Sequence, residues 1–259
     1  MMTDIYGAAA EFYDIAGRPY WKPRTAALVA AMSLAAQADS PIVDVGAGTG
    51  LVVEILGAAV PGVPILAIEP SPAMRAALAS RVLADPALAR QVTIAATTLE
   101  NTSLPARFGG LVACGVLGYL PPADRRRLWR LLAERLAPGC RAVVDAAPFP
   151  ADRTVRPIRV GVARIGRCRH ELWLGSRPAD KPGRIELTTL CRVTQDGRTL
   201  RESASTQQWW AVDMRTIVAE TAAAGLECRR AGWDLATLRT TAAPALDGLR
   251  SATADSIER

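Results

Sequence analysis

The 259-residue chain has few of the residues that mark a metal centre, a disulfide scaffold or a membrane anchor. It holds a single histidine, His170, and five scattered cysteines that form no C-x-x-C pair, so we expect no metal site. An odd number of dispersed thiols is typical of a reducing compartment. We find no apolar stretch of about twenty residues and no signal-peptide pattern. The chain is therefore predicted to be cytoplasmic, with no membrane partner.

Lysine is also scarce, because arginine supplies all but two of the 31 basic residues, and the formal net charge is +6. Six arginines crowd into residues 153–169, which is the strongest sequence argument for an acidic or nucleic-acid substrate. A nucleic-acid binder usually interleaves such a stripe with aromatic residues. A solvated lid surface explains these arginines more simply, so we do not expect nucleic acid as the partner.

What the chain does have is a glycine-rich turn. Residues 41–51 read Pro-Ile-Val-Asp-Val-Gly-Ala-Gly-Thr-Gly-Leu, an apolar strand that runs into glycines at 46, 48 and 50. Glycine adopts positive φ and lacks a Cβ, so its backbone can lie directly against a ligand. The G-x-G-x-G spacing differs from the G-x-G-x-x-G of dinucleotide-binding turns, and this disfavours a nicotinamide-dependent enzyme.

An acid ends the next predicted strand, at the distance of about twenty residues that is typical of nucleoside-binding folds. Residues 64–69 read Pro-Ile-Leu-Ala-Ile-Glu, and Ser71-Pro72 then provides an N-cap and a first-turn proline for a helix. A carboxylate can accept hydrogen bonds from both hydroxyls of a ribose. Glu69 is therefore a candidate ribose ligand.

With these residues in place, the chain resembles the class I S-adenosylmethionine-dependent methyltransferases over residues 40–147. The resemblance implies S-adenosylmethionine as the cofactor, with its methionine part along the glycine loop and its ribose at Glu69. By position, the implied cofactor-binding residues are Asp44, Gly46, Ala47, Gly48, Gly50, Glu69, Pro70, Met74, Thr98, Leu99, Cys114, Val116, Tyr13 and Arg24.

Three positions depart from the family's pattern. Many members carry an aspartate near Thr97 that binds the adenine amino group, whereas this chain offers hydroxyl and backbone groups there, with Leu99 as an apolar floor. Gly109 replaces a common aspartate, and Gly118 stands where many small-molecule members have a histidine. A base at that position is therefore missing from this sequence.

The first forty residues predict a helical segment that folds over the cofactor, as the resemblance implies. The planar fork of Arg24 can pair with the methionine carboxylate of the cofactor. Because neighbouring strand residues face opposite ways, only one of Trp209 and Trp210 can face a ligand. The residues expected to line the acceptor site are Tyr6, Tyr20, Trp21, Tyr119 and Trp210. The alternative is that the N-terminal aromatic residues only anchor a helix to the core.

Alternating strand and helix patterns predict an α/β fold, a Rossmann-like seven-stranded methyltransferase sheet with helices on both faces. Residues 148–212 change to strands joined by turns, with a hairpin at Asp196-Gly197, and predict an antiparallel β insertion after the fifth strand. The expected segments are a helical cover (1–40), a cofactor-binding core (41–147), an antiparallel lid (148–212), the C-terminal part of the core (213–245) and a tail (246–259). The lid is also the expected surface for a homodimer.

The predicted reaction is transfer of a methyl group from S-adenosylmethionine to nitrogen, oxygen or carbon of a small molecule. Exclusion of water and alignment of the attacking atom supply much of the acceleration, so a general base is optional. His170 is the candidate base, because histidine titrates near neutral pH, although a solvated strand residue is the simpler interpretation. Two alternatives stay open, an RNA or protein methyltransferase and a non-catalytic protein that binds S-adenosylmethionine.

Overall fold

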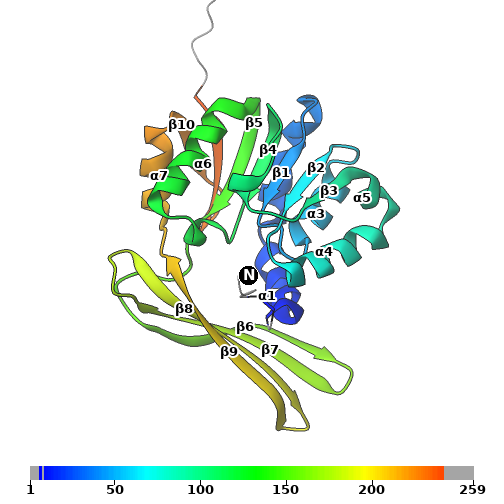
Figure 1. Cartoon of the computed structure of the whole chain (residues 1–259), viewed down its shortest axis with the longest axis vertical. Coiled ribbons are helices and arrows are strands. Elements are labelled where there is room, and N and C mark those ends of the chain that lie inside the picture. The colour runs from blue at the N-terminus through cyan, green and yellow to red at the C-terminus, as the bar shows by residue number, and fades with distance from the viewer. Residues whose placement is uncertain (1–5, 8, 242–259) are drawn as a thin grey trace, which may run out of the picture.

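The computed structural model describes residues 6–7 and 9–241, and their main feature is a seven-stranded sheet in the order β10-β11-β5-β4-β1-β2-β3 (Figure 1). The strands β1 to β5 are mutually parallel, as predicted, and β11 alone runs antiparallel to its neighbours. It reverses because a short turn, not a helical crossover, joins it to β10. The strands are β1 (Ile42–Val45), β2 (Ile65–Ile68), β3 (Val92–Ala95), β4 (Phe108–Ala113), β5 (Leu136–Asp145), β10 (Leu226–Arg230) and β11 (Leu235–Thr240).

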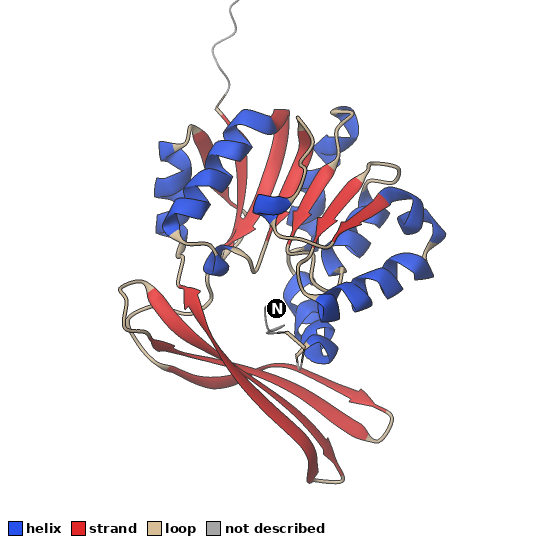
Figure 2. Ribbon diagram, in the orientation of Figure 1, coloured by secondary structure: helices blue, strands red, loops and turns tan. Residues whose placement is uncertain are grey.

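Helices cover both faces of this sheet (Figure 2), which confirms the predicted fold class. On one face α6 and α7 bury an apolar cluster around Trp129, and on the other α2 and α3 bury a second cluster around Leu56. The helices are α1 (Ala10–Trp21), α2 (Thr25–Met32), α3 (Leu51–Ala59), α4 (Pro72–Ala84), α5 (Pro86–Gln91), α6 (Pro122–Arg135) and α7 (Met214–Ala223). Short 3-10 turns are η1 (Ser33–Gln37), η2 (Leu99–Asn101) and η3 (Leu117–Tyr119).

Side chains cap the starts of two helices, and the cap at Ser71 is the one that the sequence analysis predicts. The hydroxyl of Ser71 accepts a hydrogen bond from the Met74 amide at 3.2 Å at the start of α4. The carboxylate of Asp213 accepts one from the Thr216 amide at 2.8 Å at the start of α7. Each cap satisfies a backbone donor that has no partner inside its helix.

A separate four-stranded antiparallel sheet follows β5, in the order β6-β7-β8-β9. Its strands are β6 (Val155–Ile165), β7 (Cys168–Pro178), β8 (Arg184–Gln195) and β9 (Arg198–Trp210). Asp196 and Gly197 form the tight turn between β8 and β9, with φ of 50° and 79°. In Figure 1 this sheet lies across from the carboxyl ends of β1, β4 and β5, so the predicted lid has the expected place.

The helix α1 lies between the core and this four-stranded sheet (Figures 1 and 2). Phe12 packs in a cluster with Leu172 and Cys191 of the sheet. A Cβ atom at Gly161 of β6 would lie only 2.8 Å from backbone atoms of Ile15 and Ala16, so glycine is what lets the strand approach the helix so closely. The same helix also contacts α3 and α4 of the core.

Within the described part of the chain, no helix combines the length and the apolarity that a bilayer crossing requires. The same residues contain no group of three or more His, Cys, Asp or Glu side chains that could hold a metal ion. The predicted tail, residues 246–259, and the first five residues of the predicted helical cover lie outside the described residues.

Candidate functional site

The glycine loop between β1 and α3 has the backbone geometry that its sequence requires. Gly46 and Gly48 have φ of +69° and +57°, which an L-residue with a side chain rarely adopts. A Cβ atom at Gly46 would lie 2.7 Å from Val116, and one at Gly48 would meet the ring of Tyr13 at 3.7 Å. Glycine at these two positions therefore leaves room for Val116, which follows β4, and for Tyr13 of α1.

Glu69, at the end of β2, is fixed beside this loop. The side chain is buried, with 4% of the residue exposed, and one carboxylate oxygen accepts a hydrogen bond from the Gly48 amide at 2.8 Å. The other oxygen accepts one from the Ser71 amide at 2.7 Å. The carboxylate is thus held at the edge of the glycine loop.

Asp44, near the end of β1, is a buried acid with an unsatisfied oxygen. It is 2% exposed, and its Oδ2 atom has no hydrogen-bond partner among the described residues. Burial and the neighbouring charge of Glu69 raise its pKa to about 7. A buried carboxylate oxygen without a partner is costly, so a cation or a donor supplied by a ligand would stabilise this group.

A second acid, Asp145, ends β5 in the same way that Glu69 follows β2. Its Oδ1 accepts a hydrogen bond from the Gly115 amide at 2.8 Å, and its Oδ2 accepts one from the Tyr20 hydroxyl at 2.8 Å. Burial raises the pKa of Asp145 to about 6 and raises that of the nearby Cys114 thiol well above its usual value. Our sequence prediction omitted Asp145, although an acid at the end of a strand is the signal that identified Glu69.

The segment that contains these strand ends matches a known family in sequence. Residues 43–142 match the family model described as Methyltransferase domain, a stretch that includes Asp44, the glycine loop, Glu69 and Cys114. Residues 43–142 are therefore similar in sequence to methyltransferase domains. The unsatisfied oxygen of Asp44 would suit S-adenosylmethionine, the cofactor that the sequence implies, because that molecule carries an ammonium and a sulfonium charge.

Solved methyltransferases share the fold of nearly the whole chain. One is the CcbJ methyltransferase from Streptomyces caelestis, with 21% identity, 93% of this chain and 99% of that chain covered, and a TM-score of 0.69. Another is CalS10, an amino pentose methyltransferase from Micromonospora echinaspora, with 21% identity, coverage of 88% and 96%, and a TM-score of 0.66. A third is the sugar N-methyltransferase KedS8 from a Streptoalloteichus species, with 19% identity, coverage of 88% and 92%, and a TM-score of 0.62. No curated protein matches the sequence.

Aromatic side chains gather beside the glycine loop. The hydroxyl of Tyr6 donates to that of Tyr119 at 2.5 Å, and the Tyr6 ring also packs edge-on against Tyr13 at 6.0 Å. Burial raises the pKa of all three tyrosines, so they stay neutral near pH 7. Tyr119 in turn packs edge-on against Trp209, with the ring centres 5.8 Å apart.

The tryptophan beside Tyr119 is Trp209, whereas the sequence prediction named Trp210. Trp210 lies under the guanidinium of Arg184, 5.3 Å from its ring centre, and packs against the main core. The ring of Trp209 occupies the space next to Gly118, where a Cβ atom would clash with it. The position at which related methyltransferases often have a histidine is thus filled by an indole.

Three further predicted residues have another role in the structure. The fork of Arg24 meets the carboxylate of Asp234, with Nε to Oδ1 at 3.2 Å and Nη2 to Oδ2 at 2.5 Å, and both side chains are buried. Trp21 is 8% exposed and packs in the core cluster of α2 and α3, so it anchors α1. A Cβ atom at Gly50 would lie 2.6 Å from Leu78, so this glycine allows α3 and α4 to pack closely.

The remaining predicted residues lie at different depths around the strand ends. Met74 is fully buried at the start of α4, and Pro70 before it is exposed. Thr98 and Leu99 follow β3, at the side where the adenine is expected. His170 lies on β7, and its ring packs against Phe12 of α1 at 5.7 Å. The contacts of His170 are therefore with the helix α1 and the lid, not with the strand ends.

Proposed function

We propose that this methyltransferase acts on a small-molecule amine held between the strand ends and the four-stranded sheet. The observation that carries the cofactor half of the proposal is the buried, unsatisfied carboxylate of Asp44 beside the glycine loop. The acceptor half draws on two solved structures of similar fold, which are named as an amino pentose methyltransferase and a sugar N-methyltransferase.

In this proposal Glu69 binds the ribose hydroxyls and Asp44 faces the ammonium of the methionine part. Because Gly46 and Gly48 have no Cβ atom, the cofactor can lie directly against the backbone of the loop. Thr98 and Leu99 flank the adenine. Bound there, S-adenosylmethionine supplies a methyl group on a positively charged sulfur, which a lone pair can attack in line.

Nitrogen is the acceptor atom that the surroundings favour. An uncharged amine attacks without a strong base, and Trp209 fills the place beside Gly118 where a histidine base could stand. Tyr6 and Tyr119 offer hydroxyls that can orient the acceptor, and the sheet above them excludes water. An acceptor that arrives as an ammonium ion must lose one proton before its nitrogen lone pair can attack the methyl group. The carboxylate of Asp145, bonded to Tyr20, is suited to accept that proton.

The test begins with calorimetry of S-adenosylhomocysteine binding. We expect Glu69→Ala to weaken binding by roughly tenfold or more, because hydrogen bonds to a charged group contribute about 1.5–3 kcal/mol. Glu227→Ala is the control, since Glu227 pairs with Arg239 on the surface of β10 and β11. Unchanged affinity in Glu69→Ala would contradict the ribose role.

The acceptor is then tested with matched pairs of sugars that carry an amino or a hydroxyl group at the same carbon. We expect release of S-adenosylhomocysteine and a mass gain of one methyl group with the amine alone. Methylation of the hydroxyl member would overturn the choice of nitrogen. Tight cofactor binding with no turnover on any acceptor would instead favour a non-catalytic protein.

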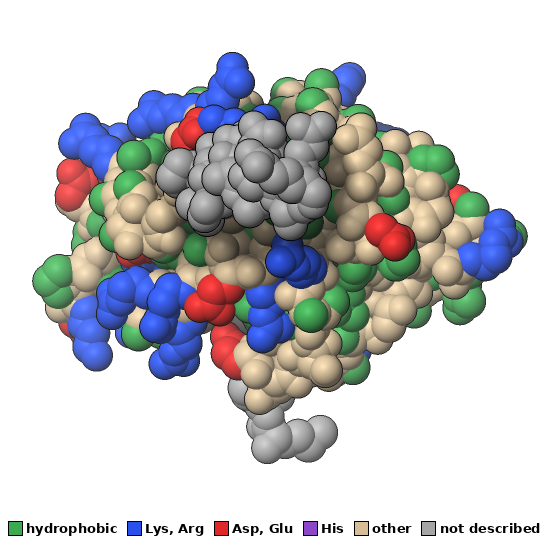
Figure 3. Space-filling model, turned by 90° about the horizontal axis from the view of Figure 1, so that it is seen from above, with side chains coloured by type: hydrophobic (Ala, Val, Ile, Leu, Met, Phe, Trp, Pro, Cys, Tyr) green, Lys and Arg blue, Asp and Glu red, His purple; other side chains and the backbone are tan. Residues whose placement is uncertain are grey.

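The arginine-rich segment also bears on the choice of a small molecule over RNA. Arg159 and Arg169 both pair with Glu171, and Arg167 pairs with Asp196. On the face seen in Figure 3, the described Lys and Arg side chains form separate groups with other side chains between them. The ion pairs of the arginine-rich segment support a solvated lid surface, and Figure 3 looks onto the end of the molecule away from the lid.

Two further expectations belong to this proposal. All five cysteines have free thiols, which suits a reducing cytoplasm. A homodimer through the four-stranded sheet stays a prediction, which light scattering on the purified protein would test.

A further inference from the structure

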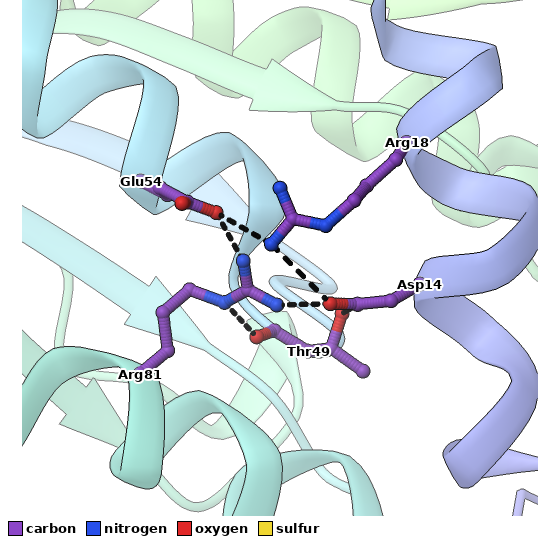
Figure 4. A network of polar contacts seen from close by, with 5 residues as sticks. All are labelled: Asp14, Arg18, Thr49, Glu54 and Arg81. Atoms are coloured by element: carbon purple, nitrogen blue, oxygen red, sulfur yellow. Dashed lines mark hydrogen bonds and ion pairs between the residues drawn. The ribbon is translucent and has the colours of Figure 1, made fainter. Parts of the chain in front are cut away.

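One partly buried cation joins three separate elements beside the glycine loop (Figure 4). Arg81, on α4, has a side chain that is only 15% exposed. Its Nε donates to the carbonyl of Thr49 at 2.9 Å, and its two terminal nitrogens pair with Asp14 of α1 and Glu54 of α3. The guanidinium therefore ties the loop, α1 and α3 to α4.

Thr49, in the loop itself, completes the connection to α1. Its hydroxyl donates to Asp14 at 2.5 Å, and the residue is 3% exposed. A second cation, Arg18, reaches Asp14 at 3.8 Å and Glu54 at 3.4 Å, but its side chain is 59% exposed. Solvent screens such an outer pair strongly, so Arg81 is the cation that holds the network together.

The network fixes the helix that covers the site. Tyr13, the neighbour of Asp14, has its ring 3.7 Å from the position of a Cβ atom on Gly48. Further along the same helix, Tyr20 donates to Asp145 at the end of β5. If α1 moves away from α3 and α4, the rings of Tyr13 and Tyr20 leave the strand ends. Access to the glycine loop therefore depends on the contacts of Asp14 with Arg81 and Thr49.

We propose that Arg81 is a positioning residue that clamps α1 over the glycine loop and sets how slowly the bound cofactor leaves. The proposal rests on the cofactor site proposed above, with the cofactor between the loop and α1. Without the Arg81 guanidinium, the solvent-exposed Arg18 is the cation left between the carboxylates of Asp14 and Glu54, and the Thr49 carbonyl loses a donor. Like charges at this distance repel, which favours separation of α1 from α3.

The test uses Arg81→Met and S-adenosylhomocysteine as the probe, with dissociation followed by stopped-flow fluorescence of the tryptophans. We expect dissociation to accelerate by roughly tenfold, with a smaller change in association, because the clamp acts on the closed state. Salt should accelerate dissociation from the wild-type protein, since the clamp is ionic, and should have little effect on the variant. Arg239→Met, which breaks the surface pair with Glu227, is the matched control and should behave as wild type.

A second measurement does not involve the cofactor. Hydrogen exchange in the ligand-free protein should be faster along α1 in Arg81→Met and unchanged in β10 and β11. Arg81→Lys, which keeps the charge but not the fork, should lie between the variant and wild type. If Arg81→Met does not fold, Asp14→Asn gives the same test, because it weakens the grip on α1 and leaves Arg81 paired with Glu54.

The outcomes separate the two proposals. Wild-type dissociation rates and wild-type exchange along α1 in a folded Arg81→Met or Asp14→Asn protein would overturn the clamp. Failure of the wild-type protein to bind S-adenosylhomocysteine would overturn the cofactor site itself.

Discussion

At the scale of single residues, the site has two acids whose surroundings suit different tasks. Asp44 has one oxygen without a partner among the described residues, which suits it to a cationic ligand. Asp145 already accepts hydrogen bonds from Tyr20 and Gly115, and its raised pKa of about 6 suits proton transfer. Two carboxylates at the same edge of one sheet can thus divide binding and proton acceptance between them.

This division predicts the effect of Asp145→Asn. We expect slower methyl transfer by about 10²–10⁴-fold, with little change in S-adenosylhomocysteine affinity, because the amide keeps the shape but cannot accept a proton. In the wild-type protein the rate should fall as the pH drops below about 6, since Asp145 is then protonated. The variant should lack that limb of the pH profile. His170→Ala is the comparison, and a larger loss there than in Asp145→Asn would make His170 the base.

At the scale of elements, the sequence predicts what depends on local pattern. The glycine loop, the caps Ser71 and Asp213 and the turn at Asp196-Gly197 follow from the conformational preferences of their residues. The partner of Arg24 does not, because Asp234 is 210 positions away in the sequence. Contacts of this kind depend on how the elements pack, which no short window of sequence contains.

The two tryptophans of β9 show the same limit. Alternation along a strand predicts that one of them faces the site, but the face depends on the register of β9 against β8. That register shifts between Val193 and Thr194, where an irregularity interrupts the pairing. Trp209 consequently packs against Tyr119 and Gly118, and Trp210 against the core.

The contact between Gly118 of η3 and Trp209 of β9 can be tested by changing the size of either side chain. Gly118→Ala places a methyl group against the Trp209 ring, so we expect a loss of about 1–3 kcal/mol in the free energy of unfolding. In a Trp209→Leu background the same Gly118→Ala change should cost much less, because the smaller side chain leaves room. Urea denaturation of the wild-type protein, the two single variants and the double variant measures the coupling free energy between the two positions. Additive effects of the two substitutions would show that the two positions do not interact.

At the scale of the whole molecule, the acids at the strand ends oppose folding near neutral pH until a ligand arrives. The pKa of Asp44 is about 7 in the folded protein against an ordinary value of 3.8, so the folded state binds its proton more tightly than the unfolded state. Its contribution to stability is therefore lost as the pH rises from about 4 through 7. Asp145 acts in the same direction, whereas Glu171, Asp213 and Glu220, whose pKa values are lowered, stabilise the fold above their ordinary range.

The other acids with shifted pKa values are the same in the wild-type protein and in Asp44→Asn. Comparing the stability of these two proteins therefore measures the effect of the Asp44 carboxyl alone. We expect the ligand-free variant to have the higher melting temperature, with a gain that grows from pH 5 to pH 8 and reaches on the order of a few kcal/mol. S-adenosylhomocysteine should raise the wild-type melting temperature more at pH 8 than at pH 6, because its ammonium favours the ionised form of Asp44. The variant should lose most of this stabilisation by the ligand. A ligand-free variant that is less stable than wild type at pH 8 would mean that Asp44 already has a partner in the empty protein.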